Sequence, residues 1–271
     1  MSKFFSTFVP DFEIIMEKIS KSQVKLIKSL QVKKFRDELG LFVAEGEKCV
    51  EELRKGFELV SLYREGENAT RTEIEQMSGL KAPQGVIAVF RKKPLSDLPL
   101  KGQENQLVLA LDGIQDPGNL GTIIRTCDWF GVHDIFCSTD TADCYNPKVV
   151  QATMGALARV RIHYVDLPAW LKEQQCPIIG TLLDGKNMYE VLADKSQFTI
   201  HNSQFTIHNS QIIVMGNEGN GISEAVRSLI THPILIPPYP KNAETSESLN
   251  VSIATAIVLA EFRRSIGSTP A

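Results

Sequence analysis

Several features that would identify common protein classes are missing from this sequence. No apolar run approaches the roughly 20 residues that a membrane-spanning helix needs. The five Cys are scattered without C-x-x-C spacing, and the five His show no paired ligand spacing. Neither a disulfide framework nor a zinc site is therefore indicated. We expect a cytoplasmic protein with reduced thiols, no metal and no membrane association.

The familiar nucleotide-binding fingerprints are also missing. The sequence has no G-x-x-x-x-G-K-[ST] loop, and its GNEGNG segment places glycines at 216, 219 and 221, which is not the G-x-G-x-x-G pattern. A tight turn from a strand into a helix explains these glycines as well as a ligand does. The segment carries little information by itself.

What remains is a composition typical of a globular protein, with 43% apolar and 23% charged residues in a chain of 271. This length suits one large or two ordinary domains. A polar segment with two prolines, RKKPLSDLPLKGQEN, predicts a linker. We expect a smaller N-terminal α/β domain over residues 1–97, a linker over 98–106, and a second domain over 107–271.

The N-terminal part carries a run of positive charge. Between Lys18 and Arg36 there are seven basic residues and no acidic one. We expect one helix from Ser22 to Leu39 that carries the basic side chains Lys25, Lys28, Lys33, Lys34 and Arg36. Such a run is typical of a solvated helix face, and it is equally what a phosphate-binding surface requires.

The second half alternates apolar runs of strand length with helical patterns, which predicts a parallel sheet covered on both faces. Leu107–Leu111 reads as a buried strand and is followed by a loop with two Gly and one Pro. A helix is expected from Leu120, with Asn119 at its N-cap and Arg125 one and a half turns further on. A polar amide and an Arg at a helix mouth suit an anionic or hydroxyl-bearing ligand.

Small polar residues, glycines and prolines follow four of the expected strands. The four clusters are Asn119 with Arg125, the corner 182–185, the turn 215–221, and the segment from Ile236 to Asn250. In open parallel sheets, ligands bind beyond the carboxyl ends of the strands. The four clusters are therefore expected to line one crevice.

Taken together, these clusters resemble a known family. The order N-L-G-x-x-x-R-T, then MGNEGNGIS, then ESLNVSIATAI is similar to the three motifs of the SpoU (TrmH) family of RNA ribose 2'-O-methyltransferases, within the SPOUT superfamily. The resemblance covers Leu107 to Phe262. The N-terminal half resembles the accessory RNA-binding domain of that family, which has a ribosomal-protein-like α/β fold.

The resemblance implies S-adenosylmethionine as methyl donor, a C-terminal parallel-sheet domain with a trefoil knot, and a homodimer. The segment Leu249–Arg263 offers some support for the homodimer, because a helix there would be apolar nearly all round and must be buried on most sides. A core helix explains that composition, and so does a core helix shared with a dimer interface.

Matching each motif of the family to this sequence identifies candidate site residues. The resemblance implies donor binding by Leu182, Met215, Gly216, Gly219, Ile236, Ser248 and Leu249. It implies a catalytic set of Asn119, Arg125, Glu218, Ser248 and Asn250. Ile236 and Leu249 can also be read as ordinary core, and Glu218 as a carboxylate favoured by a helix dipole. Arg125 is the proposed base of the family, but arginine is effectively always protonated, so a fixed positive charge that stabilises an alkoxide is the physically simpler role.

The resulting prediction is an enzyme that methylates ribose 2'-hydroxyls of structured RNA, with ribosomal RNA favoured over transfer RNA by analogy with the accessory domain. Two other readings are a non-catalytic RNA-binding or ribosome-assembly factor, and a small-molecule enzyme with another nucleotide cofactor.

Two segments of the sequence differ from the family pattern or repeat themselves. PYPKNAETSE lacks the glycine that the family often has there, and SQFTIHN is repeated at 196–202 and 203–209, as a recent loop insertion would be.

Overall fold

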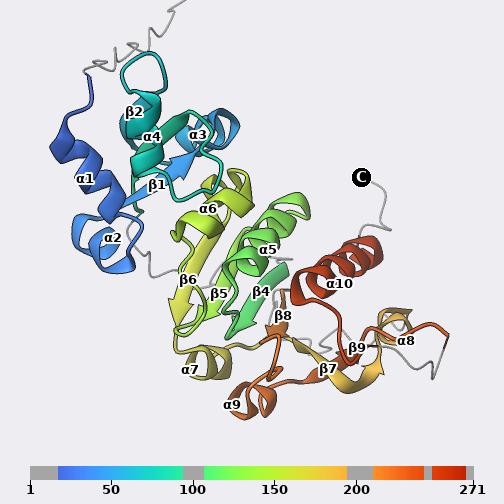
Figure 1. Ribbon diagram of the computed structural model, residues 1–271. Helices are drawn as coiled ribbons and strands as arrows, with labels where there is room; N and C mark the ends of the chain where they lie inside the picture. Colours follow the sequence, from blue (N-terminus) through green and yellow to red (C-terminus); the bar gives the residue numbers. More distant parts are fainter. Residues whose placement is uncertain (1–17, 94–106, 194–209, 241–245, 267–271) are drawn as a thin grey trace, which may run out of the picture.

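The computed structural model describes residues 18–93, 107–193, 210–240 and 246–266. The expected linker and the duplicated SQFTIHN segment lie outside these ranges. The described chain forms two α/β units that pack against each other (Figure 1). In the described part, no helix is long and apolar enough to cross a membrane.

The N-terminal unit is a three-stranded antiparallel sheet with helices around it. Its strand order is β1-β3-β2. The elements in chain order are α1 (Lys21–Ser29), α2 (Lys33–Leu39), β1 (Leu41–Glu45), α3 (Glu47–Arg54), β2 (Leu59–Arg64), α4 (Arg71–Met77) and β3 (Val86–Arg91). Capping boxes start two of the helices: Ser20 with Gln23 before α1, and Thr70 with Glu73 before α4.

The expected single helix from Ser22 to Leu39 is wrong, because the chain turns between α1 and α2. Val32 is extended, with φ −99° and ψ 129°, and restarts the helix at Lys33. The turn is held from outside, because the Gln31 side chain donates to the Met77 carbonyl at 3.1 Å. Gly40 then ends α2 with φ 64°, a left-handed conformation that glycine adopts without strain.

The second unit is built on a six-stranded sheet in the order β6-β5-β4-β8-β7-β9, and every pairing in it is parallel. The expected parallel sheet is thus confirmed. Its elements are β4 (Leu107–Asp112), α5 (Pro117–Trp129), β5 (Asp134–Ser138), α6 (Pro147–Thr153), the 3-10 turn η1 (Ala156–Ala158), β6 (Arg161–Val165), α7 (Leu167–Lys172), β7 (Ile178–Asn187), α8 (Met188–Ala193), β8 (Gln211–Gly216), α9 (Glu224–Arg227), β9 (His232–Leu235) and α10 (Val251–Ile266).

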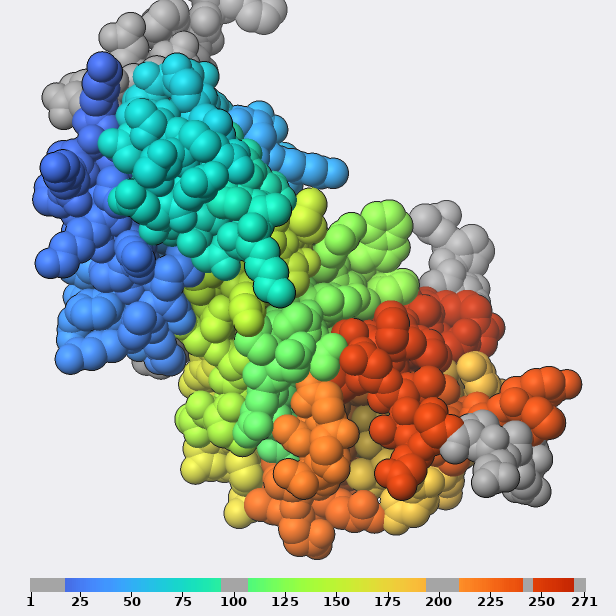
Figure 2. All heavy atoms as spheres, viewed as in Figure 1, coloured from blue at the N-terminus to red at the C-terminus, as the bar shows by residue number. Residues whose placement is uncertain are grey.

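Alternation along the central strands explains why helices cover both faces of the sheet. Leu107, Leu109 and Leu111 pack toward α5, α6 and α10, whereas Val108 and Ala110 pack toward α7 and α9. Helix α10 lies beside α5 in Figures 1 and 2, where red packs against green. The two helices run in the same direction, so their N-terminal ends lie together at the carboxyl edge of the sheet.

The two units share one hydrophobic core rather than touching at their surfaces. Phe42 of β1 lies 4.8 Å from the ring of Tyr145 and 5.0 Å from that of Phe57, measured between ring centroids. The backbones also approach closely, since a Cβ added to Gly155 would lie 2.2 Å from the Cβ of Glu52. The close fit positions the N-terminal unit firmly against α6 and the loop after β5.

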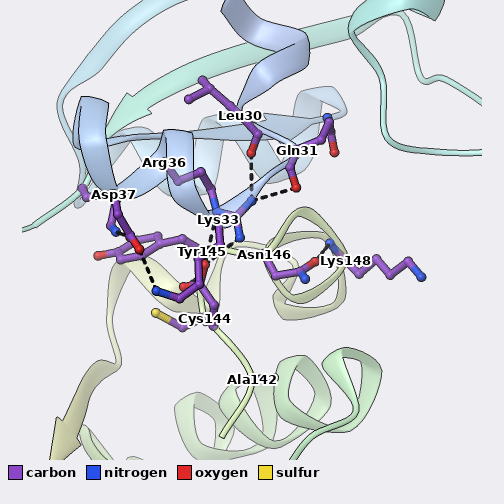
Figure 3. A network of polar contacts seen from close by, with 12 residues as sticks. Leu30, Gln31, Lys33, Arg36, Asp37, Ala142, Cys144, Tyr145, Asn146 and Lys148 are labelled. Atoms are coloured by element: carbon purple, nitrogen blue, oxygen red, sulfur yellow. Dashed lines mark hydrogen bonds and ion pairs between the residues drawn. The ribbon is translucent and has the colours of Figure 1, made fainter. Parts of the chain in front are cut away.

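A buried ion pair crosses the same junction (Figure 3). Arg36 Nη2 lies 2.7 Å from Asp143 Oδ2, and the two side chains are 2% and 11% exposed. Arg36 Nε also donates to Asp143 Oδ2 at 3.2 Å, and Nη1 donates to the carbonyls of Leu30 and Gln31, at 2.8 and 2.9 Å. Every face of this buried charge is therefore compensated by carboxylate or backbone oxygen.

Candidate active site

The candidate site lies at the carboxyl end of the sheet, where the loops that follow the neighbouring strands β4 and β8 lie side by side. Strand β4 ends at Asp112, whose carboxylate accepts the Ser223 N–H at 2.7 Å. Gly113 follows with φ 72° and donates its N–H to Ser138 Oγ at 2.8 Å. These bonds join the loop after β4 to the loops after β5 and β8.

The turn after β8 is a close-packed glycine turn. Asn217 and Gly221 exchange two backbone hydrogen bonds of 2.9 Å. A Cβ on Gly216 would lie 2.4 Å from the carbonyl carbon of Gly221, so no other residue fits there without a shift. The result is a turn whose main chain packs tightly against itself.

Asn217 holds this turn against the loop after β4. Its amide Nδ2 donates to the Gly113 carbonyl at 2.6 Å, while its Oδ1 accepts from the N–H groups of Gly219 and Asn220. The sequence places Asn217 in the glycine cluster without indicating a role for it. The available signal is an asparagine directly after a strand that ends in glycine, because asparagine readily caps turns of this kind.

Three side chains from distant segments form a chain of hydrogen bonds across the site. Asn119 Nδ2 donates to Glu218 Oε1 at 2.8 Å. Asn250 Nδ2 donates to Asn119 Oδ1 at 3.0 Å, and Asn250 Oδ1 accepts from the N–H groups of Ser252 and Ile253 at the start of α10. The three motifs recognised in the sequence therefore meet at one place.

One local detail of the sequence reading is wrong. The N-cap of α5 is Asp116, which accepts the Asn119 N–H at 2.7 Å, and not Asn119 itself. Pro117 takes the first helical position, where its missing N–H costs nothing. Asn119 consequently sits inside the first turn with its amide free to bridge Glu218 and Asn250.

Arg125 and Ser248 lie outside that hydrogen-bond chain. Arg125 is exposed on α5 and pairs with no carboxylate among the described residues. Ser248 is exposed two residues before Asn250, and its carbonyl accepts from Ser246 Oγ at 3.4 Å. Both side chains thus remain available to an incoming ligand.

The other expected donor-binding positions lie in or directly after the adjacent strands β8, β7 and β9, except Leu249, which precedes α10. Met215 is buried at the end of β8, Ile236 follows β9, and Leu249 is 48% exposed before α10. Leu182 lies in β7 next to a bulge, because Thr181 and Lys186 both pair with Ile234 of β9. The bulge bends residues 182–185 out of the sheet. This agrees with the turn that the sequence predicts there.

Neither a reactive thiol nor a metal cluster suggests another site in the described part of the chain. Burial raises the pKa of all five thiols, to about 11 for Cys49 and Cys176 and about 12 for Cys144. Thiolate chemistry is therefore not indicated. No group of three His, Cys, Asp or Glu side chains that could hold a metal ion occurs among the described residues.

Comparisons with known proteins agree with this arrangement. Residues 106–260 match the SpoU rRNA Methylase family, and residues 21–71 match the MRM3-like substrate binding domain. The chain is 27% identical to a 23S rRNA (guanosine(2553)-2'-O)-methyltransferase of Bacillus subtilis, over 92% of this chain and 98% of the relative.

Solved structures give the same result. A TrmH-family protein from Porphyromonas gingivalis is 36% identical with a TM-score of 0.71, over 91% of this chain and 98% of its own. An rRNA methyltransferase from Sinorhizobium meliloti, crystallised with S-adenosylmethionine, is 29% identical with a TM-score of 0.73, over 92% and 96%. Because the family match spans more than half of the sequence, this chain belongs to the SpoU rRNA methylase family.

Proposed function

We propose that this protein transfers a methyl group from S-adenosylmethionine to a ribose 2'-hydroxyl of ribosomal RNA, in the cytoplasm. The observation that carries the proposal is the hydrogen-bond chain Glu218–Asn119–Asn250, which unites the three motifs at the carboxyl edge of the sheet. The relative from Bacillus subtilis, named as a 23S rRNA 2'-O-methyltransferase and matched over nearly its full length, supports the choice of substrate.

The residues present suit S-adenosylmethionine as the donor. Gly216 has no side chain and packs against the backbone of Gly221 and Ile222, so a ligand beside this turn would meet backbone N–H and carbonyl groups. Met215 and Ile236 supply apolar contact beside it, with Leu182, Gly219, Ser248 and Leu249 completing the proposed set. When bound, the donor supplies an electrophilic methyl group attached to sulfur.

Arg125 is proposed to act on the acceptor. As the ribose oxygen bonds to the methyl carbon and the carbon–sulfur bond breaks, the hydroxyl proton leaves to water and negative charge develops on oxygen. The guanidinium of Arg125 would stabilise that charge and hold the adjoining phosphate. Asn119 and Asn250 would orient the ribose, with Glu218 fixing the Asn119 amide and Ser248 at the rim.

The RNA surface is proposed to include helices α1 and α2. Lys25 and Lys28 are exposed and form no ion pair among the described residues, whereas Lys33 and Lys34 are exposed but pair with Asp37 and Glu38. Arg36 is excluded, which corrects the sequence-based assignment: it is buried at the domain junction and is bonded entirely within the protein.

A homodimer built on α5 and α10 is part of the proposal. Trp129 is 86% exposed at the C-terminal end of α5, and Ile253 is 53% exposed near the start of α10. Large apolar side chains on two adjacent helices are typical of a surface that a second copy covers. The trefoil knot also stays a prediction; it is supported by the position of β8 between β4 and β7 and by the return of α10 to α5.

Two experiments test the activity. A calorimetric titration should give micromolar binding of S-adenosylmethionine and no heat with NAD, which separates the proposal from another nucleotide-dependent enzyme. Mapping ribose methylations in total RNA with and without this protein should show at least one ribosomal position lost in its absence. Unchanged ribosomal methylation together with a lost position in transfer RNA would contradict the proposed substrate.

A further inference from the structure

A pocket of about 360 Å³ lies at the junction of the two units, along the edge strand β6. Its walls come from α2, the end of β3, the loop after β5, and β6 itself. The volume falls within the ~300–1,000 Å³ typical of ligand sites. Figure 3 shows part of this wall, with Lys33 and Asp37 of α2 close to Tyr145 of the loop. None of the residues assigned to the proposed active site lines it.

Positive charge dominates the lining. The cations are Lys33, Lys92, Lys93 and Arg161, against two acids, Asp37 and Asp143. Neither acid is a free negative charge: Arg36 neutralises Asp143, while Asp37 lies 2.6 Å from the ammonium groups of both Lys33 and Lys92. Arg161 is in turn paired with Asp134, so the excess positive charge comes from Lys93 and from Lys33 and Lys92, which share one carboxylate.

Lys93 is the least compensated of these cations. It has no carboxylate partner among the described residues, and its ammonium lies 4.6 Å from the centroid of the Phe57 ring. Partial burial lowers the pKa of Lys93, and the nearby positive charge of Arg161 lowers it further. Arg161 already donates from Nε and Nη2 to Asp134, so only its Nη1 is left for a ligand, and Lys93 is the cation that gains most from a bound anion, as in phosphate sites.

The rest of the lining suits a nucleoside rather than a bare anion. The Tyr164 hydroxyl is already used, since it donates to the Ala142 carbonyl and accepts the Cys144 N–H, so only its ring faces a ligand. Leu157 and Ile162 add apolar wall, and Thr139 adds a hydroxyl. Aromatic and apolar walls beside cations are the usual surroundings of an unstacked RNA base.

The pocket borders both the proposed RNA surface on α1 and α2 and the loops of the proposed active site. Lys33 belongs to α2, which continues the basic surface of α1. At the other end, Thr139 and Thr141 flank Asp140, whose carboxylate would lie 3.2 Å from a Cβ on Gly113. Gly113 in turn accepts the Asn217 amide at the active-site turn. One loop thus borders both the pocket and the proposed active site.

We propose that this pocket is a second RNA subsite, which takes one nucleotide of the substrate with its phosphate on Lys93 and Arg161 and its base against the Tyr164 wall. The inference rests on the proposed function, because it places a neighbouring nucleotide of the same RNA. It adds a contact from the catalytic unit itself, so that the RNA is held on both sides of the domain junction while the target ribose is aligned.

The first test removes charge. A short fluorescein-labelled single-stranded RNA of mixed sequence serves as the probe, and its binding is measured by fluorescence anisotropy over a salt series. Lys93→Gln should weaken binding roughly fivefold or more and reduce the slope of log Kd against log[salt] by about one. Lys172→Gln, at an exposed lysine of α7 on the opposite face of the sheet, is the matched control and should bind like the parent protein.

The second test removes space and leaves the charge unchanged. Thr139 is exposed at the pocket, so Thr139→Trp should block it without disturbing the core, whereas Ala169→Trp on α7 adds the same bulk elsewhere. We expect weaker RNA binding for the former variant and parent-like binding for the latter. Parent-like binding by both Lys93→Gln and Thr139→Trp would overturn the subsite. Weakening by Lys93→Gln with none by Thr139→Trp would also overturn it, in favour of a surface phosphate contact.

The failure of this inference can be told apart from failure of the proposed function. Titration of each variant with S-adenosylmethionine should give the parent Kd, because the donor site is separate. With ribosomal RNA as substrate, Lys93→Gln should raise KM for RNA and leave KM for the donor unchanged. If the parent protein binds no donor, the proposed function fails first; if it methylates RNA and these variants behave like it, only the subsite fails.

Discussion

The amide of Asn119 and the carboxylate of Glu218 lie 2.8 Å apart, although 99 positions separate them in the sequence. Asn119 belongs to the first turn of α5 and Glu218 to the glycine turn after β8, and β4 and β8 are neighbours in the parallel sheet. Adjacent parallel strands end at the same edge, so two short motifs far apart in the chain become one polar site.

The domain junction should depend on its buried ion pair. Arg36→Met removes one partner and leaves the Asp143 carboxylate buried without its cation, which should lower the free energy of unfolding by about 3 kcal/mol. Urea denaturation followed by circular dichroism measures the change. The double variant Arg36→Met/Asp143→Asn should recover part of the loss, because no lone charge remains. Equal stability of the single variant and the parent would show that the pair is not structurally important.

Acid stability should depend on Asp134. Burial alone would raise the pKa of this carboxyl, but hydrogen bonds from His163 and Arg161 outweigh that effect and lower its pKa from 3.8 to about 2. Because the folded-state pKa is depressed, the stabilisation is present above about pH 4 and is lost as the pH falls toward 2. Asp134→Asn should therefore cost about 2 kcal/mol at pH 7 and nearly nothing at pH 2. A cost that does not change with pH would contradict this assignment.

The basic surface of α1 should control RNA affinity in a salt-dependent way. Lys25→Gln/Lys28→Gln removes two exposed charges that have no acidic partner in the described structure. The slope of log Kd against log[salt] for ribosomal RNA should fall by about two. Lys33→Gln/Lys34→Gln is the matched comparison, and its effect should be smaller because Asp37 and Glu38 already offset those charges. An unchanged slope for the first pair would remove α1 from the RNA surface.

Association of two copies should depend on the exposed ends of α5 and α10. Trp129→Glu introduces a charge where an apolar contact is proposed, and light scattering coupled to gel filtration should report a shift from about 60 to about 30 kDa, the mass of one chain being 30.1 kDa. Trp170→Glu is unsuitable as a control because that ring stacks on Phe136. Tyr189→Glu, at an exposed aromatic of α8, serves instead and should leave the mass unchanged. A parent protein that already runs as a monomer would contradict the proposed dimer.

The sequence alone predicts the parallel sheet, and it predicts that Asn119, Glu218 and Asn250 lie close together. Both follow from periodicity and from short motifs placed at strand ends, which are local signals. The cap of α5 can also be read from the sequence, because Asp116–Pro117 is a stronger helix start than Asn119. Helix α8 was not predicted; its six residues are too few to show a period.

Arg36 illustrates what the sequence could not provide. It belongs to a run of basic residues, and nothing in that run distinguishes a solvated side chain from a buried one. Its burial depends on the turn at Val32 and on Asp143, which is 107 positions away. The pocket beside β6 was equally inaccessible, because its walls come from two units whose packing is a property of the whole fold.

The central claim is that the three motifs assemble a methyltransferase site that acts on ribose through Arg125. The most direct measurement is transfer of tritiated methyl from S-adenosylmethionine to deproteinised ribosomal RNA, followed by digestion and separation of the nucleosides. We expect the label in a 2'-O-methylnucleoside. Arg125→Ala should lower kcat by 10²-fold or more while donor binding by calorimetry is retained. Label in a methylated base, or full activity of Arg125→Ala, would contradict the account.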